Sequence, residues 1–131
     1  MPDFAIDASP LDCDPIVEVR TTFPCREDAL ACAERLVRER LAACVQVDGP
    51  ITSVYRWEGA VETAAEYRCT GKTSRSRAAA CADAIRALHG YQTPEVIVGE
   101  ALASPAYAAW VRASVAAEHH GGGGVDAGPR T

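Results

Sequence analysis

The chain has 131 residues, of which 48% are hydrophobic and 24% charged, with a formal net charge of −5 at pH 7. This length and composition predict one folded domain with a packed core. The negative charge argues against a general nucleic-acid-binding protein, which usually presents a basic face. No apolar run approaches the roughly 20 residues of a membrane span, and no secretion signal is recognisable at the N-terminus. We therefore expect a cytoplasmic protein that binds neither nucleic acid nor membrane.

The six cysteines are spread along the chain without a C-x-x-C pair, which removes the usual signal of a zinc knuckle. An even number of cysteines allows disulfides, but the chain has enough apolar residues to build a core without them. We interpret most of the cysteines as small buried apolar residues in a reducing compartment.

The first elements follow from periodicity. Residues 1–14 mix Pro, Asp and Ser with few large apolar side chains, which is typical of a flexible leader. Alternation of polar and apolar residues predicts a half-buried strand over 16–22. Apolar residues then recur at three- and four-residue steps over 26–42, with acidic residues first and arginines last, which predicts an amphipathic helix.

The longest predicted element is an antiparallel ribbon over 44–73 that turns at Glu58-Gly59. Aromatic and β-branched residues before the turn suit a strand, and glycine in the second loop position suits a type I′ turn. Pro50 cannot donate to a strand ladder, so a bulge or an edge position is expected there. A ribbon of this length exceeds what two short helices can cover, which indicates contact with a partner subunit.

The remaining pattern predicts a helix over 75–89 that Gly90 ends, a short strand over 95–100, and a helix over 105–117 that begins at Ser104-Pro105. Residues 118–131 are interpreted as a flexible tail. The order is typical of an α+β, ferredoxin-like split βαβ fold (βαββαβ with an added C-terminal helix) in one domain over 15–117. Helices would cover one face of the sheet, so the other face is expected to contact further copies of the chain.

Catalytic motifs are missing from the sequence. Gly71-Lys72-Thr73 resembles the end of a phosphate-binding loop, but Glu66 stands where that motif needs its first glycine. No serine elbow, zinc-protease helix or dinucleotide fingerprint occurs. We predict that the protein is not an enzyme.

Three stretches in this order and spacing resemble the CutA divalent-cation tolerance family. They are RLAAC at 40–44, TSVYRWEG at 52–59 and GYQTPEVI at 90–97. With Lys72-Thr73 and the segment 105–110, the resemblance covers 16–115. It implies ferredoxin-like subunits in a compact homotrimer, related in architecture to the PII signalling trimers, with long ribbons that pair across subunits. It also implies a role in tolerance of copper and other divalent metals.

The resemblance further implies a copper site made by a cysteine at the end of the first strand and two adjacent histidines at the end of the second helix. The matching positions here are Thr21, Leu88 and His89, so only His89 keeps a ligand type. Copper prefers thiolate and imidazole donors, and two of the three are replaced. His89 is therefore interpreted either as a metal ligand for Cu or Zn, completed by Glu95 or another subunit, or as a contact to the last carbonyls of its helix.

Lys72, Tyr91 and Glu95 are the second candidate site. If the third strand ends at Lys72 and the fourth begins at Glu95, the two residues and Tyr91 would converge near a subunit boundary. A cation, a carboxylate and a phenol together suit a small anion or zwitterion. The alternative is a structural Lys–Glu pair with Tyr91 in packing.

The ribbon holds further candidates. Trp57, like Tyr55, is interpreted as a packing anchor or as a ring that stacks on a ligand. The carboxylates Glu58, Glu62 and Glu66 form either a site for a hard cation or a solvated strand face. Three functions thus remain open: a trimeric divalent-metal protein, a PII-like regulatory trimer that binds a small molecule or a protein partner, and a ligand-free scaffold.

Overall fold

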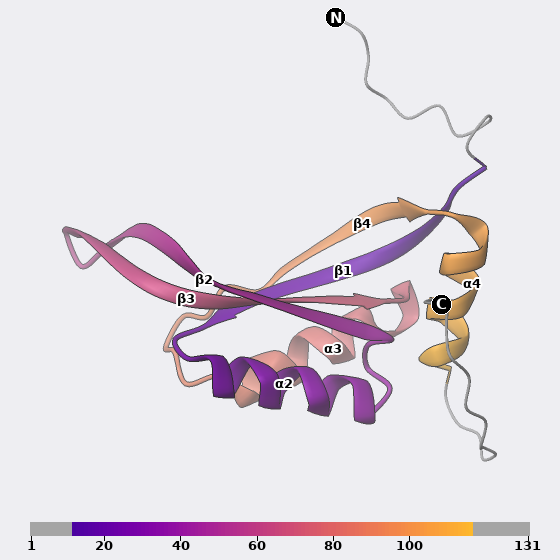
Figure 1. Cartoon of the computed structure of the whole chain (residues 1–131), viewed down its shortest axis with the longest axis horizontal. Helices are drawn as coiled ribbons and strands as arrows, with labels where there is room; N and C mark the ends of the chain where they lie inside the picture. The colour runs from indigo at the N-terminus through magenta and orange to yellow at the C-terminus, as the bar shows by residue number, and fades with distance from the viewer. Residues whose placement is uncertain (1–11, 117–131) are drawn as a thin grey trace, which may run out of the picture.

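The structure, a computed structural model, describes residues 12–116. The elements are β1 (Asp14–Phe23), α2 (Arg26–Arg38), β2 (Cys44–Trp57), β3 (Ala60–Thr73), α3 (Arg75–Leu88), β4 (Ile97–Ala103) and α4 (Pro105–Ser114). The strands form one antiparallel sheet in the order β2-β3-β1-β4. Helices α2 and α3 lie together on one side of it (Figure 1). This confirms the ferredoxin-like arrangement predicted from the sequence.

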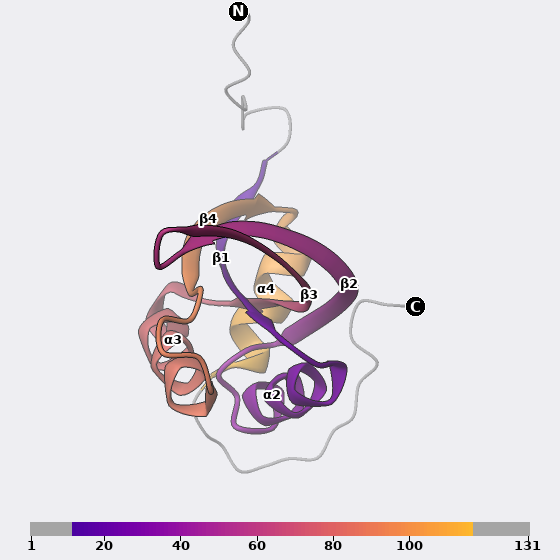
Figure 2. The ribbon, with the colours of Figure 1, turned by 90° about the vertical axis from the view of Figure 1, so that its left-hand side faces the viewer.

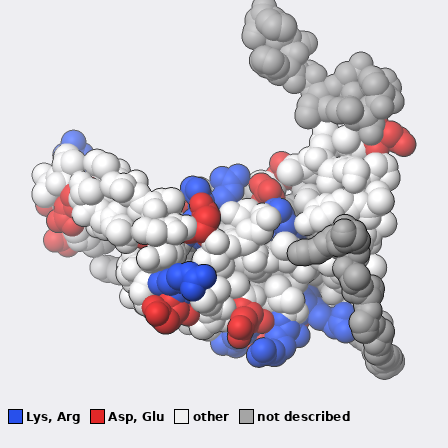
Figure 3. Space-filling view, viewed as in Figure 1, with Lys and Arg blue, Asp and Glu red and all other residues white. Residues whose placement is uncertain are grey.

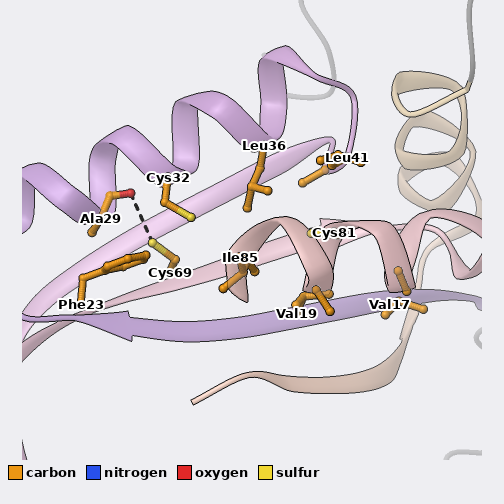
Figure 4. Packing of buried hydrophobic residues seen from close by; sticks show 13 residues of the cluster. Val17, Val19, Phe23, Ala29, Cys32, Leu36, Leu41, Cys69, Cys81 and Ile85 are labelled. Carbon is orange, nitrogen blue, oxygen red and sulfur yellow. Dashed lines mark hydrogen bonds between the residues drawn. The ribbon is translucent and has the colours of Figure 1, made fainter. Parts of the chain in front are cut away.

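The core follows from the alternation of side chains in β1. Val17 and Val19 point toward α2 and α3, where they pack in the main hydrophobic cluster with Leu36 and Ile85 (Figure 4). Ile16 points to the opposite face and packs with Ala108 and Val111 of α4. Helix α4 therefore covers one end of the sheet face that α2 and α3 leave open.

Helix α2 ends at Arg38, four residues before the predicted end. Arg40 adopts a left-handed conformation with φ 61°. Its N–H donates to the carbonyl of Val37 at 3.0 Å, and the N–H of Leu41 donates to the carbonyl of Leu36 at 2.9 Å. These two bonds define a Schellman motif with arginine where glycine is usual. Leu41 is buried at 9% exposure, so the apolar pattern continues after the helix has ended.

The later boundaries also shift. Helix α3 ends at Leu88, and its cap His89 has an extended backbone with φ −85° and ψ 144°. Gly90 is thus not a left-handed cap, because the described glycines with positive φ are Gly49 and Gly59. Strand β4 begins at Ile97, two residues later than predicted. The Ser104 cap of α4 is confirmed, since its hydroxyl accepts from the N–H of Tyr107 at 3.3 Å.

The ribbon turns as predicted. Glu58 and Gly59 both have positive φ, 50° and 84°, as a type I′ turn requires. Strand β1 pairs with β3 only over 67–73, so 51–57 and 60–66 extend beyond the sheet as a two-stranded projection (Figures 1 and 2). The predicted bulge lies between Asp48 and Ile51, and the Gly49–Pro50 peptide bond there is cis.

The predicted tail over 118–131 lies outside the described residues, as does most of the predicted leader. Asp14, which the leader was expected to include, already belongs to β1. Cys32, Cys69 and Cys81 are buried, and the other three cysteines are partly exposed. Within residues 12–116, no helix has the length and apolar character needed to cross a membrane.

Candidate functional site

An open groove of about 740 Å³ lies between the root of the projection and the segment that joins α3 to β4. We call it the ribbon groove. Its wall includes three aromatic rings and three carboxylates, from Tyr55, Trp57, Tyr91, Glu62, Glu66 and Glu95. It lies on the sheet face that α2 and α3 do not cover. Acidic and basic side chains lie next to each other on the surface of the helices in Figure 3. One ion pair at the end of α2 joins Arg35 and Glu39 at 2.8 Å.

The bulge determines which ribbon side chains reach this groove. Before it, Asp48 pairs with Arg68; after it, Ile51 pairs with Glu66, so β2 gains one residue over β3. This extra residue reverses the faces of the strand. Tyr55 consequently pairs directly with Glu62, and both side chains lie on the same face as Glu66.

Glu66 is the most buried carboxylate of the groove, at 9% exposure. Its Oε1 accepts a hydrogen bond from Ser53 Oγ at 2.7 Å. Its Oε2 accepts from Tyr91 Oη at 2.9 Å and from Thr22 Oγ1 at 3.3 Å. Within residues 12–116, no lysine, arginine or histidine forms an ion pair with it. Glu66 therefore joins β1, β2 and the segment after α3 through neutral donors, and its charge has no counter-ion in the described chain.

Tyr91 is held as a donor by this arrangement. Burial raises the pKa of the Tyr91 phenol to about 12, and the hydrogen bond to Glu66 acts in the same direction. The phenol is consequently protonated throughout the physiological range and can donate to the Glu66 carboxylate.

His89 lies behind the groove and has partners for both ring nitrogens. Nδ1 lies 3.3 Å from the backbone N–H of Tyr91, and Nε2 lies 2.7 Å from the carbonyl oxygen of Thr22. Because a backbone N–H only donates, Nδ1 accepts, and we assign the proton to Nε2. The ring also stacks on Phe23 with centroids 4.2 Å apart. A metal ion at His89 would have to displace one of these hydrogen bonds.

Of the other two positions that the resemblance assigns to copper, Thr21 is buried and Leu88 is partly buried. Thr21 is 0% exposed, and its Oγ1 has no hydrogen-bond partner among residues 12–116. Leu88 packs against the main cluster. Among residues 12–116, no three His, Cys, Asp or Glu side chains are placed to hold a metal ion. A copper site that includes His89 would therefore need ligands from outside the arrangement seen in residues 12–116.

The predicted cleft residues separate into two places. Trp57, Tyr91 and Glu95 line the ribbon groove, as expected for a cleft, but Lys72 does not. Strand β1 lies between β3 and β4 and pairs with both, so Lys72 is separated from β4 by a whole strand and is level with Gly99, past the start of β4. The Nζ of Lys72 donates to Gln46 Oε1 at 3.1 Å instead. Lys72 therefore does not join Tyr91 and Glu95 in the groove of its own chain, and their convergence at a subunit boundary stays a prediction.

The hydrogen bonds that Thr22 and Ser53 donate to Glu66, and the central position of Glu66 in the groove, were not predicted from the sequence. The position of Ser53 was predictable from the expected bulge, because an extra residue in β2 moves its odd-numbered side chains onto the face of Glu66. Glu58, which was grouped with Glu62 and Glu66, lies apart from them in the turn.

The sheet order, the paired helices and the projecting ribbon define a ferredoxin-like α+β domain with a groove at the ribbon root. A family model described as CutA1 divalent ion tolerance protein matches residues 17–114. The chain therefore belongs to this family, as the sequence resemblance indicated.

Individual relatives agree with this assignment. A probable divalent-cation tolerance protein cutA homolog from Encephalitozoon cuniculi is 39% identical over 98 residues, covering 74% of this chain and 85% of the relative. The crystal structure of CutA from Xylella fastidiosa has a TM-score of 0.75 at 32% identity, covering 77% of this chain and 98% of that one. The crystal structure of CutA1 from Oryza sativa has a TM-score of 0.73 at 36% identity, covering 78% and 94%.

Proposed function

We propose that this protein acts in divalent-cation tolerance as a non-enzymatic, cytoplasmic homotrimer that binds copper or zinc. The main support for this proposal is membership in the CutA1 family, whose family model matches residues 17–114. We also propose that neither nucleic acid nor membrane is a partner. Relatives named as chloroplastic or periplasmic occur, so the location is tested by fractionation of the cells that make the protein.

Assembly is supported by apolar side chains that one chain leaves exposed. Val54 and Val61 on the projection are 67% and 64% exposed, and Val98 and Leu102 on β4 are 51% and 46% exposed. Apolar surface grouped in this way is typical of an interface. The projection extends beyond the sheet and β4 is an edge strand, so each can pair with a strand of another copy.

Metal binding at a subunit boundary is supported by the ligand types near the groove. Glu62 and Glu95 line it and form no ion pair in the described chain. His89 could add an imidazole if one of its backbone hydrogen bonds opened. These groups do not form a complete ligand set within residues 12–116, so we propose that a neighbouring copy supplies a further group.

The test combines native mass measurement with calorimetric titration of Cu²⁺ and Zn²⁺ into the metal-free full-length chain. The reference protein carries His119→Asn and His120→Asn, because an adjacent histidine pair binds these metals on its own. We expect a trimer and micromolar or tighter binding that His89→Ala removes. Phe23→Leu, which removes the stacking partner of His89 but no ligand, is the control. A monomer or an absence of saturable binding contradicts the proposal.

A second candidate is a PII-like regulatory trimer that binds a small metabolite at clefts between subunits. The volume of the ribbon groove, about 740 Å³, falls in the range of ligand pockets, roughly 300–1,000 Å³. A melting shift produced by a metabolite and weakened by Glu95→Gln supports this candidate. A ligand-free scaffold predicts no response to metal or metabolite.

A further inference from the structure

The charge of the ribbon groove is unbalanced. Its wall contains Glu62, Glu66 and Glu95, and none of its lining residues is lysine, arginine or histidine. Elsewhere in the described chain the exposed acidic groups often have a nearby basic partner, as with Asp48 and Arg68 at 3.1 Å. The groove is thus a place where a positively charged ligand gains electrostatic energy without displacing a resident cation.

The rings of the groove are more open than large aromatic side chains usually are. Tyr55 and Trp57 are each 41% exposed, and Tyr91 is 36% exposed. The face of an aromatic ring attracts a cation within about 6 Å of its centre. Tyr55 stands directly beside Glu62 in the strand ladder, so a ring and a carboxylate are presented together.

The Glu66 carboxylate can accept one more hydrogen bond, at Oε1. A carboxylate offers about four lone-pair positions. Oε2 already accepts from Tyr91 and Thr22, whereas Oε1 accepts only from Ser53 among the described residues. The carboxylate is held in place by these hydroxyls, so an arriving N–H donor meets an oriented acceptor and forms a charge-assisted hydrogen bond.

The arrangement distinguishes between two kinds of cation. A compact metal ion needs several oxygen ligands around one point, and no such set of three acidic, cysteine or histidine side chains exists among residues 12–116. The lining of the groove contains aromatic rings as well as carboxylates. This layout fits an extended ligand with a charged nitrogen and an apolar body.

We propose that the ribbon groove binds an organic cation, with an ammonium or guanidinium group at Glu66 and an apolar body against Trp57 and Tyr55. The proposal deepens the metabolite-binding candidate and rests on it, because the groove must remain open in the assembled protein. It does not depend on binding of copper or zinc.

The first test uses three probes with the same phenyl ring and similar linkers but different charge. They are phenethylamine, 2-phenylethanol and 3-phenylpropionate, titrated by calorimetry into the full-length protein at pH 7 and low salt. We expect saturable binding of the amine, at least tenfold weaker binding of the alcohol, and none of the carboxylate. A tenfold difference corresponds to about 1.4 kcal/mol, which is within reach of one charge-assisted hydrogen bond. Equal binding of amine and alcohol overturns the proposal.

The second test uses variants of the groove. Glu66→Gln and Trp57→Leu should each weaken amine binding about tenfold or more, and Glu95→Gln should weaken it without touching the hydroxyl partners of Glu66. Glu27→Gln is the matched control, because it removes one exposed acidic charge in the first turn of α2. Equal weakening by Glu27→Gln would mean that only net charge matters, which overturns the site.

Two outcomes separate this inference from the other proposals. Amine binding in a protein that does not bind Cu²⁺ or Zn²⁺ supports the inference while the metal proposal fails. If the amine does not bind and Glu66→Gln instead weakens the homotrimer, a basic side chain of a neighbouring copy fills the groove, and the inference is overturned.

Discussion

Thr21 and Thr73 are a matched pair for measuring the energetic effect of a buried hydroxyl in this core. Both side chains are 0% exposed, and both lie on the helix-facing side of neighbouring strands β1 and β3. Thr73 Oγ1 donates to the carbonyl of Leu41 at 2.8 Å, whereas Thr21 Oγ1 has no hydrogen-bond partner in the described part of the chain. Replacement of each by valine removes the hydroxyl with little change in shape.

The two replacements should have opposite signs. A buried polar group without a partner costs about 1–3 kcal/mol, so Thr21→Val should raise the free energy of unfolding by about 1 kcal/mol. Thr73→Val removes a hydrogen bond and leaves the Leu41 carbonyl without that donor, so it should lower the free energy of unfolding by about 1–2 kcal/mol. The difference between the variants, about 2–3 kcal/mol, is well within measurable range.

The assay is urea unfolding followed by circular dichroism. Protomer concentration is held constant, because assembly makes apparent stability depend on concentration. Equal m-values with shifted midpoints show that stability itself has changed. A Thr21→Val protein that is less stable than the wild type would refute the reasoning, since the hydroxyl would then have a favourable partner.

Three further predictions concern the ribbon and the groove. Gly49→Ala should lower the free energy of unfolding by about 2–4 kcal/mol, because φ is 147° and the new Cβ would lie 2.8 Å from the Glu66 carbonyl oxygen; Gly99→Ala, with nothing within 4 Å, should change it by less than about 0.5 kcal/mol. Glu58→Asn should raise the urea midpoint slightly, because asparagine tolerates the φ of 50° better than glutamate does. The Tyr91 phenol should ionise near pH 12, an absorbance change that Tyr91→Phe removes. Since its folded pKa lies above the ordinary value of 10.0, its contribution to stability is complete below pH 10 and is lost as the pH rises through 12; equal alkaline unfolding of Tyr91→Phe and wild type would contradict this.

Local patterns identified most of the fold. The type I′ turn at Glu58-Gly59 and the bulge near Pro50 were predicted because each depends on the chemistry of one or two residues. The end of α2 was missed because Arg40 occupies a left-handed position where the sequence gives no glycine to mark it. The apolar face continues to Leu41, which enters the core without being helical.

The site was only partly predictable because it depends on long-range pairing. Tyr91, Glu95 and Trp57 are identified by their chemistry, whereas the position of Lys72 depends on long-range strand pairing, because β1 separates β3 from β4. The partners of Glu66 come from three separate parts of the chain, and no local pattern connects them. The hydrogen bonds of His89 could likewise not be predicted from the sequence, because its partners are backbone groups of Thr22 and Tyr91.

The two-stranded projection extends from the sheet next to the ribbon groove, so any rotation at its root is amplified at its tip. Residues 51–57 pair with 60–66 and with no other described strand, which at about 3.3 Å per residue gives a reach of about 23 Å. A bend of about 10° at the root would therefore move the tip by about 4 Å over that reach. Ser53 and Glu66 lie at this root and are joined by a hydrogen bond of 2.7 Å, so a ligand that rotated the root by this angle would move Glu58-Gly59 by the same distance of about 4 Å.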